Sequence, residues 1–215
     1  MKRFIIFDLD GTLLNTIADL AVSTNQALKY FGYPEHPTEA YRLFVGNGIN
    51  KLFERALPET ERTEENISRI RSRFIPYYNE HNADFSTPYP GIPEMLQTLH
   101  NQGIILAVAS NKYQAATEKL IAHYFPTIPF AKVLGQRDGI PVKPNPTIVF
   151  DILKEVNITK EEVLYVGDSG VDMQTALNAN VEAIGVTWGF RSRTELEPFN
   201  PLAIINRAEE LLEFI

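Results

Sequence analysis

The chain has 215 residues, of which 44% are hydrophobic and 22% are charged, and its formal net charge is −7. It contains no cysteine, which excludes disulfides, thiolate metal sites and cysteine nucleophiles, and it has neither the clustered lysine and arginine of a nucleic-acid-binding protein nor an apolar run near the roughly 18 residues of a membrane span. We therefore expect a cytoplasmic protein without nucleic-acid or membrane partners, built as one domain with a sizeable insertion or as two small domains.

The first predicted element is a buried strand, the apolar run FIIF (4–7), and two aspartates follow it one residue apart, Asp8 and Asp10. Open α/β sheets bind ligands at the carboxyl ends of their strands, and residues two apart in a strand lie on one side of it. Two carboxylates about 4 Å apart repel by about 4 kcal/mol at an effective dielectric constant near 20, so we expect a cation or a shared proton between them. The alternative is an ordinary strand end, because Asp-Gly is also a common turn dipeptide.

The next stretch, residues 14–85, shows helical spacing and no convincing strand. Thr16 and Asp19 have the spacing of a capping box at the start of a first helix, and Gly32 is suited to end that helix. Further helices are predicted in YRLFV (41–45), INKLFERAL (49–57) and the charged run ERTEENISRIRSRF (61–74). We interpret the stretch as an α-helical cap domain that is inserted after the first strand.

We expect this cap to be joined to the rest of the chain by two hinges, one near residues 13–16 and one in the proline-rich stretch STPYPGIP (86–93). The predicted catalytic core then consists of residues 1–13 and 86–215, and the predicted cap domain consists of residues 14–85.

Beyond the second hinge, short apolar runs alternate with amphipathic helical patterns. The predicted strands are IILAVA (104–109), AKVL (131–134), VLYVG (163–167), AIGV (183–186) and AII (203–205). The predicted helices begin near Pro93, near Tyr113, at Asn145-Pro146, after Ser169 and after Asn206. This alternation predicts an α/β fold with a Rossmann-like parallel sheet and helices on both of its faces.

Polar residues follow the later strands, and each has two interpretations. In VASNK (108–112), Ser110 and Asn111 either cap the next helix or bind an anion through the hydroxyl and a backbone N–H. In VKPNP (142–146), Lys143 is either a solvated surface charge or a fixed positive charge that faces phosphate or a carboxylate, because the prolines restrict the backbone around it.

The segment VGDSGVDM (166–173) contributes two more carboxylates, Asp168 at a strand end and Asp172 one turn into the next helix. Ser169 and Asp172 also have capping-box spacing, so a purely structural role is the alternative. With the pair after the first strand, four carboxylates would gather at one edge of the sheet. Because four unneutralised carboxylates in one cleft are costly, we expect a hard divalent cation, and Mg²⁺ suits carboxylates combined with phosphate and water.

In this order, DLDGTLLNT, VASNK, VKPNP and GDSGVDM resemble the four motifs of the haloacid-dehalogenase-like hydrolase superfamily, and the insertion is similar to that superfamily's C1-type helical cap. Within the cap, FVGNGINKLFERAL (44–57) resembles phosphoglycolate phosphatases, where a Gly-Asn-Gly turn leads into a helix with a basic residue. Many relatives carry Asp where this chain has Asn15, a position that we interpret as part of the hinge or of the layer behind the site.

The resemblance implies a Mg²⁺-dependent phosphatase that hydrolyses a small phosphorylated metabolite through an aspartyl-phosphate. Asp8 would be the nucleophile, and Asp10 would be the general acid and then the general base. The implied metal ligands are Asp8, Asp168, Asp172 and the backbone carbonyl of Asp10, and the implied phosphate-binding residues are Ser110, Asn111 and Lys143.

Four cap residues are candidates for substrate specificity, namely Gly46, Asn47, Gly48 and Lys51. The Gly-Asn-Gly turn can direct backbone N–H groups toward an anion, and Lys51 can add a positive charge for a carboxylate that lies beyond the phosphate. The alternative is a simple turn between two helices, followed by a solvated lysine.

Other functions remain open at this point. A phosphomutase or a pyrophosphatase of the same superfamily would share the core motifs. A response-regulator-like module that accepts a phosphate without being an enzyme also combines a parallel sheet with aspartates and a lysine, but such a module is about half this length and has no lid.

Overall fold

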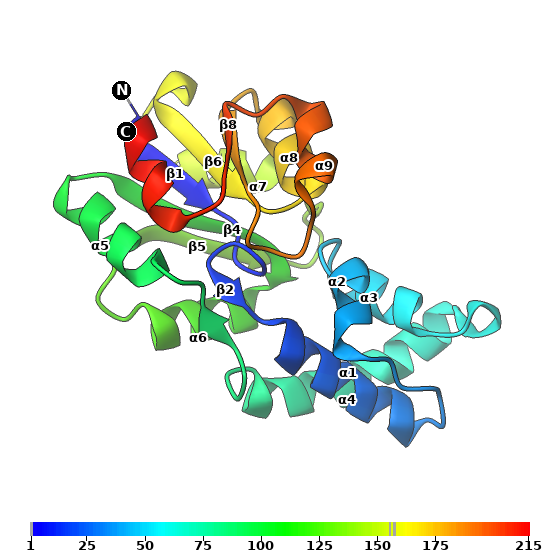
Figure 1. Ribbon diagram of the computed structural model, residues 1–215. Coiled ribbons are helices and arrows are strands. Elements are labelled where there is room, and N and C mark those ends of the chain that lie inside the picture. Colours follow the sequence, from blue (N-terminus) through cyan, green and yellow to red (C-terminus); the bar gives the residue numbers. More distant parts are fainter. Residues whose placement is uncertain (1, 155, 157) are drawn as a thin grey trace.

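The computed structural model describes residues 2–154, 156 and 158–215, so residues 1, 155 and 157 of the predicted core lie outside the described part. Its main sheet contains β1 (Phe4–Phe7), β4 (Ile105–Tyr113), β5 (Phe130–Gln136), β6 (Val163–Gly167), β7 (Glu182–Val186) and β8 (Ala203–Ile205). The strand order is β5-β4-β1-β6-β7-β8, and every neighbouring pair is parallel (Figure 1). All six predicted strands are therefore present, and β4 continues past the predicted end at Ala109.

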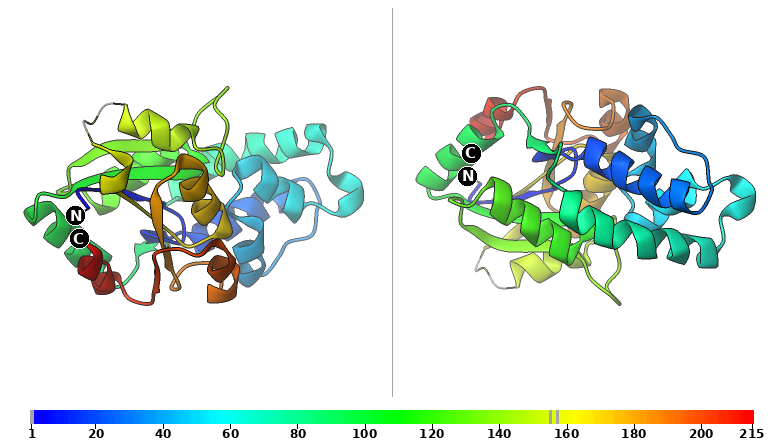
Figure 2. Two further views of the ribbon diagram at one scale, coloured as in Figure 1. Left: turned by 90° about the horizontal axis from the view of Figure 1, so that it is seen from above. Right: turned by 90° about the horizontal axis from the view of Figure 1, so that it is seen from below.

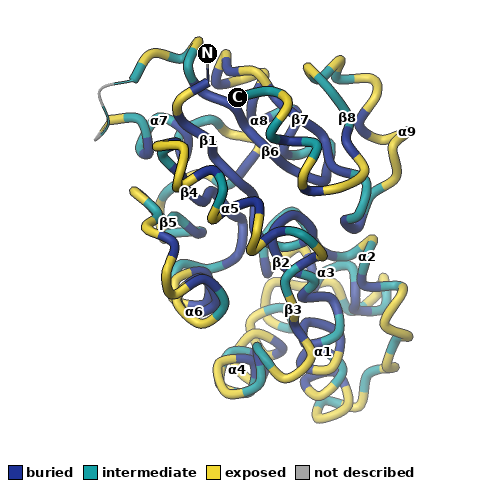
Figure 3. Tube along the Cα trace, turned by 60° about the vertical axis from the view of Figure 1, so that its left-hand side comes forward, coloured by how far each residue is buried: buried dark blue, intermediate teal, exposed yellow. Residues whose placement is uncertain are grey.

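β1 lies in the middle of the sheet, between β4 and β6. All four of its residues are buried, as the dark colour along this strand in Figure 3 shows. Ile5 and Phe7 belong to the hydrophobic cluster on one face of the sheet, and Phe4 and Ile6 belong to the cluster on the other face. A strand that is covered on both faces needs no polar alternation, which explains the uninterrupted run FIIF.

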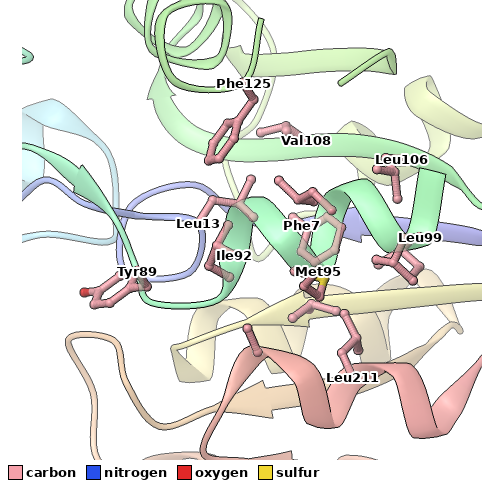
Figure 4. Close-up of a cluster of buried hydrophobic side chains, with 14 of the residues drawn as sticks. Phe7, Leu13, Tyr89, Ile92, Met95, Leu99, Leu106, Val108, Phe125 and Leu211 are labelled. Atoms are coloured by element: carbon pink, nitrogen blue, oxygen red, sulfur yellow. The ribbon is translucent and has the colours of Figure 1, made fainter. Parts of the chain in front are cut away.

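Helices cover both faces of the sheet (Figure 2). One face is covered by α5 (Ile92–Asn101), α6 (Gln114–Tyr124) and the 3₁₀ helix η5 (Ala208–Phe214), and the other by α7 (Thr147–Leu153) and α8 (Gly170–Ala179). Figure 4 shows Met95, Leu99 and Leu211 packed around Phe7 on the first of these faces. The remaining core helices are η3 (Lys160–Glu162), α9 (Arg193–Leu196) and η4 (Glu197–Phe199). The predicted α/β fold is thus confirmed, although the last predicted helix is of the 3₁₀ type.

The predicted insertion folds as a group of helices beside the sheet (Figures 1 and 2). It contains α1 (Ile17–Tyr30), η1 (Thr38–Ala40), α2 (Tyr41–Phe44), α3 (Ile49–Ala56), η2 (Glu59–Glu61) and α4 (Glu64–His81). These helices share a hydrophobic cluster that is distinct from the two clusters of the sheet, with Leu28, Phe53 and Phe74 fully buried in it. The cluster also includes Ala116 and Phe190 from outside the predicted insertion, so α1 to α4 pack on one another and on neighbouring parts of the chain.

Two very short strands connect this group of helices to the sheet. β2 (Leu14–Asn15) and β3 (Thr87–Pro88) pair in antiparallel orientation. The expectation that residues 14–85 contain no strand is wrong at β2, because two residues are too few to show the alternation that reveals a strand. The pairing places side by side the two points at which the chain crosses between the insertion and the sheet, the first crossing at β2 and the second at β3. These are the two stretches where hinges are expected.

The expected capping box at the start of α1 is also wrong. Thr16 makes no capping hydrogen bond; its hydroxyl donates instead to Oδ1 of Asp10, at 2.7 Å. The Asp19 carboxylate accepts hydrogen bonds from the backbone N–H of Phe85, at 3.0 Å, and of Ser86, at 2.8 Å, and from the Ser86 hydroxyl. Asp19 thus bonds to partners far along the chain and joins the first crossing of the chain to the second, whereas Thr16 bonds to Asp10 on the loop after β1.

Among the described residues, no helix combines the length and the apolar character that crossing a membrane requires.

Candidate active site

Three neighbouring strands end beside one another at the edge of the sheet that faces the cap. Asp8 directly follows β1, Asp168 directly follows β6, and Ser110 lies near the end of β4. Because β1 pairs with both β4 and β6 in parallel orientation, their carboxyl ends meet at one edge of the sheet. The fold therefore places these three motifs together.

A cavity of about 50 Å³ lies between this edge and the cap. Its lining includes every core residue that the sequence predicts for the site, namely Asp8, Asp10, Ser110, Asn111, Lys143, Asp168 and Asp172. From the predicted cap residues, Gly46 and Gly48 line the cavity, whereas Asn47 and Lys51 are not among its lining residues.

Three carboxylates converge at the base of the cavity. One oxygen each of Asp8, Asp168 and Asp172 lies within 4.8 Å of the others, and all three residues are buried. Burial raises the pKa of Asp8 to about 7, although Lys143 lowers it. Burial, together with the charges of Asp172 and Asp8, raises the pKa of Asp168 well above its ordinary value. Converging buried carboxylates of this kind are the donor set of a hard cation such as Mg²⁺.

Asp172 is held in this group by its neighbours in the sequence. Its Oδ2 accepts hydrogen bonds from the backbone N–H of Ser169, at 3.1 Å, and from the Ser169 hydroxyl, at 2.6 Å. The capping box is therefore present at the start of α8, and it fixes the carboxylate that faces the site. The structural interpretation of this motif is therefore confirmed, and Asp172 also lines the cavity.

Lys143 is a buried cation inside this acidic group. Its Nζ lies 2.8 Å from Oδ1 of Asp8 and 2.7 Å from Oδ1 of Asp172, and it also donates to the carbonyl of Ala109 and the hydroxyl of Tyr165. Burial alone lowers the pKa of Lys143, but Asp172 and Asp8 outweigh burial and hold it well above the ordinary value. Of the two interpretations of Lys143, the fixed positive charge therefore applies, because its side chain is only 2% exposed and is not solvated.

Ser110 and Asn111 do not cap a helix, because β4 continues through them and α6 begins only at Gln114. The Asn111 side chain instead clamps the lysine loop: its Oδ1 accepts from the Lys143 N–H at 2.8 Å, and its Nδ2 donates to the Lys143 carbonyl. The same Nδ2 donates to the Gly46 carbonyl of the cap, at 3.0 Å. The side-chain amide of Asn111 is therefore engaged in structural contacts.

Sequence reasoning missed Lys112, although it lies within the motif VASNK. Its Nζ lies 3.0 and 2.9 Å from the two carboxylate oxygens of Asp10, and its side chain is 3% exposed. The ammonium also lies 4.9 Å from the centre of the Tyr78 ring on α4 of the cap. The Asp10 carboxylate therefore points toward Lys112 and Thr16 and is not part of the converging three.

The loop that follows β7 was also missed. The backbone N–H of Phe190 donates to Oδ2 of Asp168 at 2.7 Å. Gly189 packs so closely that an added Cβ would lie 2.3 Å from the carbonyl oxygen of Gly11 and 2.4 Å from Asp168. Gly11 itself has φ +91° and faces the same carboxylate, so both glycines are required by close approach and, at Gly11, by the backbone conformation. No short motif in the sequence marks this loop.

In the cap, the Gly-Asn-Gly turn is braced by side chains on both sides. Asn47 accepts a hydrogen bond from Arg55 of α3 at 2.7 Å. Lys51 forms an ion pair with Glu54 at 2.6 Å, and its side chain is 54% exposed. This arrangement brings the two glycines, but not Lys51, to the cavity.

Comparisons with known proteins agree with this geometry. Residues 5–186 match the family described as haloacid dehalogenase-like hydrolase. The chain is 32% identical to a phosphoglycolate phosphatase of Mannheimia succiniciproducens, covering 99% of this chain and 98% of the relative, and 33% identical to one of Vibrio parahaemolyticus, covering 99% and 96%. A crystal structure of a candidate phosphoglycolate phosphatase from Lactobacillus delbrueckii subsp. bulgaricus is 33% identical, with a TM-score of 0.93 over 100% of this chain and 99% of that one.

The family match spans most of the chain, and the relatives that exceed 30% identity cover almost all of it. The resemblance seen in the four sequence motifs is thereby confirmed. The chain belongs to the haloacid dehalogenase-like hydrolases, and it is a phosphoric monoester hydrolase.

Proposed function

We propose that the protein is a Mg²⁺-dependent phosphatase that hydrolyses a small phosphomonoester, phosphoglycolate or a close analogue, through an aspartyl-phosphate on Asp8. The observation that carries this proposal is the convergence of three buried carboxylates with the Lys143 ammonium at the edge of the sheet. The names of the full-length relatives support the substrate.

Asp8 is the proposed nucleophile. It follows a strand that is buried on both faces, which holds its carboxylate in place relative to a bound phosphate. A carboxylate oxygen attacks the phosphorus atom in line while the ester oxygen leaves, and an acyl phosphate forms on the side chain. Attack of water on the same phosphorus then releases inorganic phosphate and restores Asp8.

Asp10 is the proposed proton carrier. It gives a proton to the leaving ester oxygen in the first step and accepts one from the attacking water in the second. The Thr16 hydroxyl and the Lys112 ammonium hold its carboxylate in one orientation. Thr16 is the last residue of the first motif, in the predicted hinge, and Lys112 belongs to β4, so we assign the positioning of the proton carrier to the hinge and to β4.

The phosphoryl oxygens are assigned to Lys143, to the Ser110 hydroxyl and to the backbone N–H of Asn111. Lys143 already lies 2.8 Å from Asp8, so a phosphoryl group attached to Asp8 would lie within its reach. The ammonium and the phosphoryl group would be paired throughout the reaction, because the side-chain amide of Asn111 clamps the backbone of Lys143.

The three converging carboxylates fit Mg²⁺, since each can offer an oxygen within one small, buried space. We assign ligation to Asp8, Asp168, Asp172 and the backbone carbonyl of Asp10. When bound there, Mg²⁺ would supply positive charge that offsets the repulsion between the nucleophile and the phosphate and stabilises the charge of the transition state.

We further propose that residues 14–85 act as a lid whose hinge is the ribbon of β2 and β3. The cavity is lined from both sides, by strand ends of the core and by cap residues such as Gly46 and Leu52. Closing such a lid excludes water other than the reacting molecule and completes the substrate site.

The test is the release of inorganic phosphate from phosphoglycolate by the purified protein with Mg²⁺. Asp8→Asn should lower kcat by several orders of magnitude, because an amide of nearly the same shape is a poor nucleophile. Asp151→Asn is the matched control, since Asp151 pairs with Arg137 and Lys154 away from the cavity.

Near-wild-type turnover by Asp8→Asn would overturn the mechanism. Conversion of a sugar phosphate without net phosphate release would instead indicate a phosphomutase, and a protein that takes up one phosphate without turnover would indicate a signalling module.

A further inference from the structure

The loop after β7 joins the site, the first motif and the cap through consecutive residues. The Trp188 indole N–H donates to the carbonyl of Thr12 at 3.0 Å, and the Phe190 N–H donates to Asp168. The Phe190 side chain belongs to the hydrophobic cluster of the cap. In the other direction, Arg42 of the cap donates to the carbonyl of Gly189 at 3.2 Å. The side chains of this loop therefore lie where the cap meets the core.

Arg191 is the next residue of this loop. It is among the residues that line the cavity, and its side chain is 13% exposed. One terminal nitrogen donates to the carbonyl of Arg42 and the other donates to the carbonyl of Val45 at 2.8 Å. Its Nε lies 3.4 Å from Glu195. A guanidinium has five N–H groups, so these contacts account for three and leave two without an acceptor among residues 2–154, 156 and 158–215.

The charge of Arg191 differs from that of the other cations that line the cavity. Lys143 is paired with Asp8 and Asp172, and Lys112 is paired with Asp10. The ion-pair partner of Arg191 is Glu195, which does not line the cavity and is 41% exposed. Of the described cations in the lining, Arg191 is thus the one that forms no ion pair with a carboxylate of the site.

The surroundings of this guanidinium define what it can bind. The cap side of the cavity is mostly apolar, with Val45, Ile49, Leu52 and Phe74 among its lining residues, and Tyr78 adds a hydroxyl. Gly46 leaves space beside the arginine, because an added Cβ there would lie 3.6 Å from Nη2. A short carbon chain that ends in an anion matches an apolar wall with one guanidinium, and two parallel N–H groups match a carboxylate in particular.

We propose that Arg191 determines specificity for phosphomonoesters with an acidic tail, by receiving the carboxylate that lies beyond the phosphate. The inference rests on the proposed phosphatase function and assigns to a core residue the role that the sequence suggested for Lys51. Arg191 already donates to the carbonyls of Arg42 and Val45 in the cap, so a carboxylate bound to it would also connect the substrate to the closed lid.

The test compares two esters of similar shape, phosphoglycolate and isobutyl phosphate, in which a neutral branched group replaces the carboxylate. We expect Arg191→Gln to lower kcat/KM for phosphoglycolate by about 10- to 100-fold more than for isobutyl phosphate, the scale of a hydrogen bond to a charged group. Arg193→Gln is the matched control, because Arg193 lies two residues further, pairs with Glu197 and is 46% exposed. Lys51→Gln tests the competing assignment.

The outcomes separate the inference from the function on which it rests. If wild-type protein hydrolyses neither ester, the proposed function fails. If it hydrolyses them but Arg191→Gln loses both equally, Arg191 only holds the lid, and the inference is overturned. The inference is also overturned if Arg191→Gln loses neither, or if Lys51→Gln and not Arg191→Gln changes the ratio. A gain of Arg191→Gln on phosphoethanolamine relative to phosphoglycolate would further support the inference, because that tail is cationic.

Discussion

At the scale of residues, the candidate site contains two lysines that are almost fully buried. Burying an ammonium group is costly unless carboxylates and hydrogen-bond acceptors replace the lost water. Lys143 has two carboxylates and two neutral acceptors within reach, and Lys112 has both oxygens of Asp10. The acidic groups of the site therefore hold both lysines in place, and each lysine in turn orients a carboxylate.

Lys112→Met tests the orienting role of the second lysine. Without the ammonium, the Asp10 carboxylate keeps only the Thr16 hydroxyl, so kcat should fall by about 10- to 100-fold, part of the 10²- to 10⁴-fold that a positioned acid or base supplies. KM should change little, since Lys112 is not assigned to the phosphate. Steady-state kinetics on phosphoglycolate measure both, with Lys154→Met as the exposed control. A change in KM with unchanged kcat would place Lys112 at the substrate instead.

At the scale of elements, the predicted hinge is formed by two segments that are far apart in the sequence and pair with each other. β2 and β3 pair over two residues each, which is too short to be stable alone. Asp19, at the start of α1, adds hydrogen bonds to Phe85 and Ser86, just before β3. The position of α1 is therefore tied to the second crossing of the chain, and the cap is anchored at both of its ends.

Asp19→Ala should loosen this anchor. It leaves two backbone N–H groups and a buried hydroxyl without their acceptor, at a cost of about 1–3 kcal/mol each before relaxation and water entry. We expect the urea midpoint to fall and limited proteolysis to begin near residue 85. Asp84→Ala is the neighbouring control, because Asp84 pairs with His81 at the surface and is 47% exposed. Equal stability and equal protease resistance of Asp19→Ala and the control would refute the anchor.

At the scale of the whole molecule, the sheet and the cap meet over the three converging carboxylates. Each of the two units has a hydrophobic core of its own, and Phe190 from the core loop packs into the cluster of the cap. The negative charge of these carboxylates is unfavourable by itself. Burial and mutual repulsion disfavour it, and they raise the pKa of Asp8 and of Asp168. Whatever neutralises this charge should therefore stabilise the folded protein.

Mg²⁺ should raise the Tm of the wild-type protein. At a Mg²⁺ concentration ten times the dissociation constant, linkage gives about 1.4 kcal/mol, which is about 3–6 °C for a chain of this size. Asp168→Asn should raise Tm in the absence of metal, since it removes one buried charge, and it should reduce the response to Mg²⁺. Calorimetry measures both effects, and Asp151→Asn should respond as wild type does. An equal response of Asp168→Asn and wild type would exclude this metal site.

Ca²⁺ should stabilise the protein in the same way but should not support turnover. Its larger coordination number lets it engage both oxygens of a carboxylate, which would leave Asp8 without a free oxygen for attack. Phosphate release with Ca²⁺ as the only divalent cation, at the rate seen with Mg²⁺, would contradict this.

The order of residues along the chain is enough to predict the sheet and the groups at its carboxyl edge. FIIF and VLYVG are apolar along their whole length because strands of a parallel sheet are buried on both faces, and this pattern is local. Asp8, Ser110 and Asp168 follow from it, since any residue just beyond such a strand lies at the same edge. The four motifs in their order were sufficient to indicate the family.

The partners of those residues could be known only from the packing of the folded chain. Thr16 and Asp19 have the spacing of a local cap, yet Thr16 bonds to Asp10 on the loop after β1 and Asp19 bonds to Ser86. Partners that folding brings close compete with those at the start of the helix, and sequence spacing records only the latter. The same holds for the cation that we assign to the acidic tail. Lys51 lies in the motif that suggested the role, but it pairs with Glu54 on the same helix, whereas Arg191 reaches the cavity from a loop that no motif marks. Which charge enters a site depends on how separate elements pack, and that is set only when the whole chain has folded.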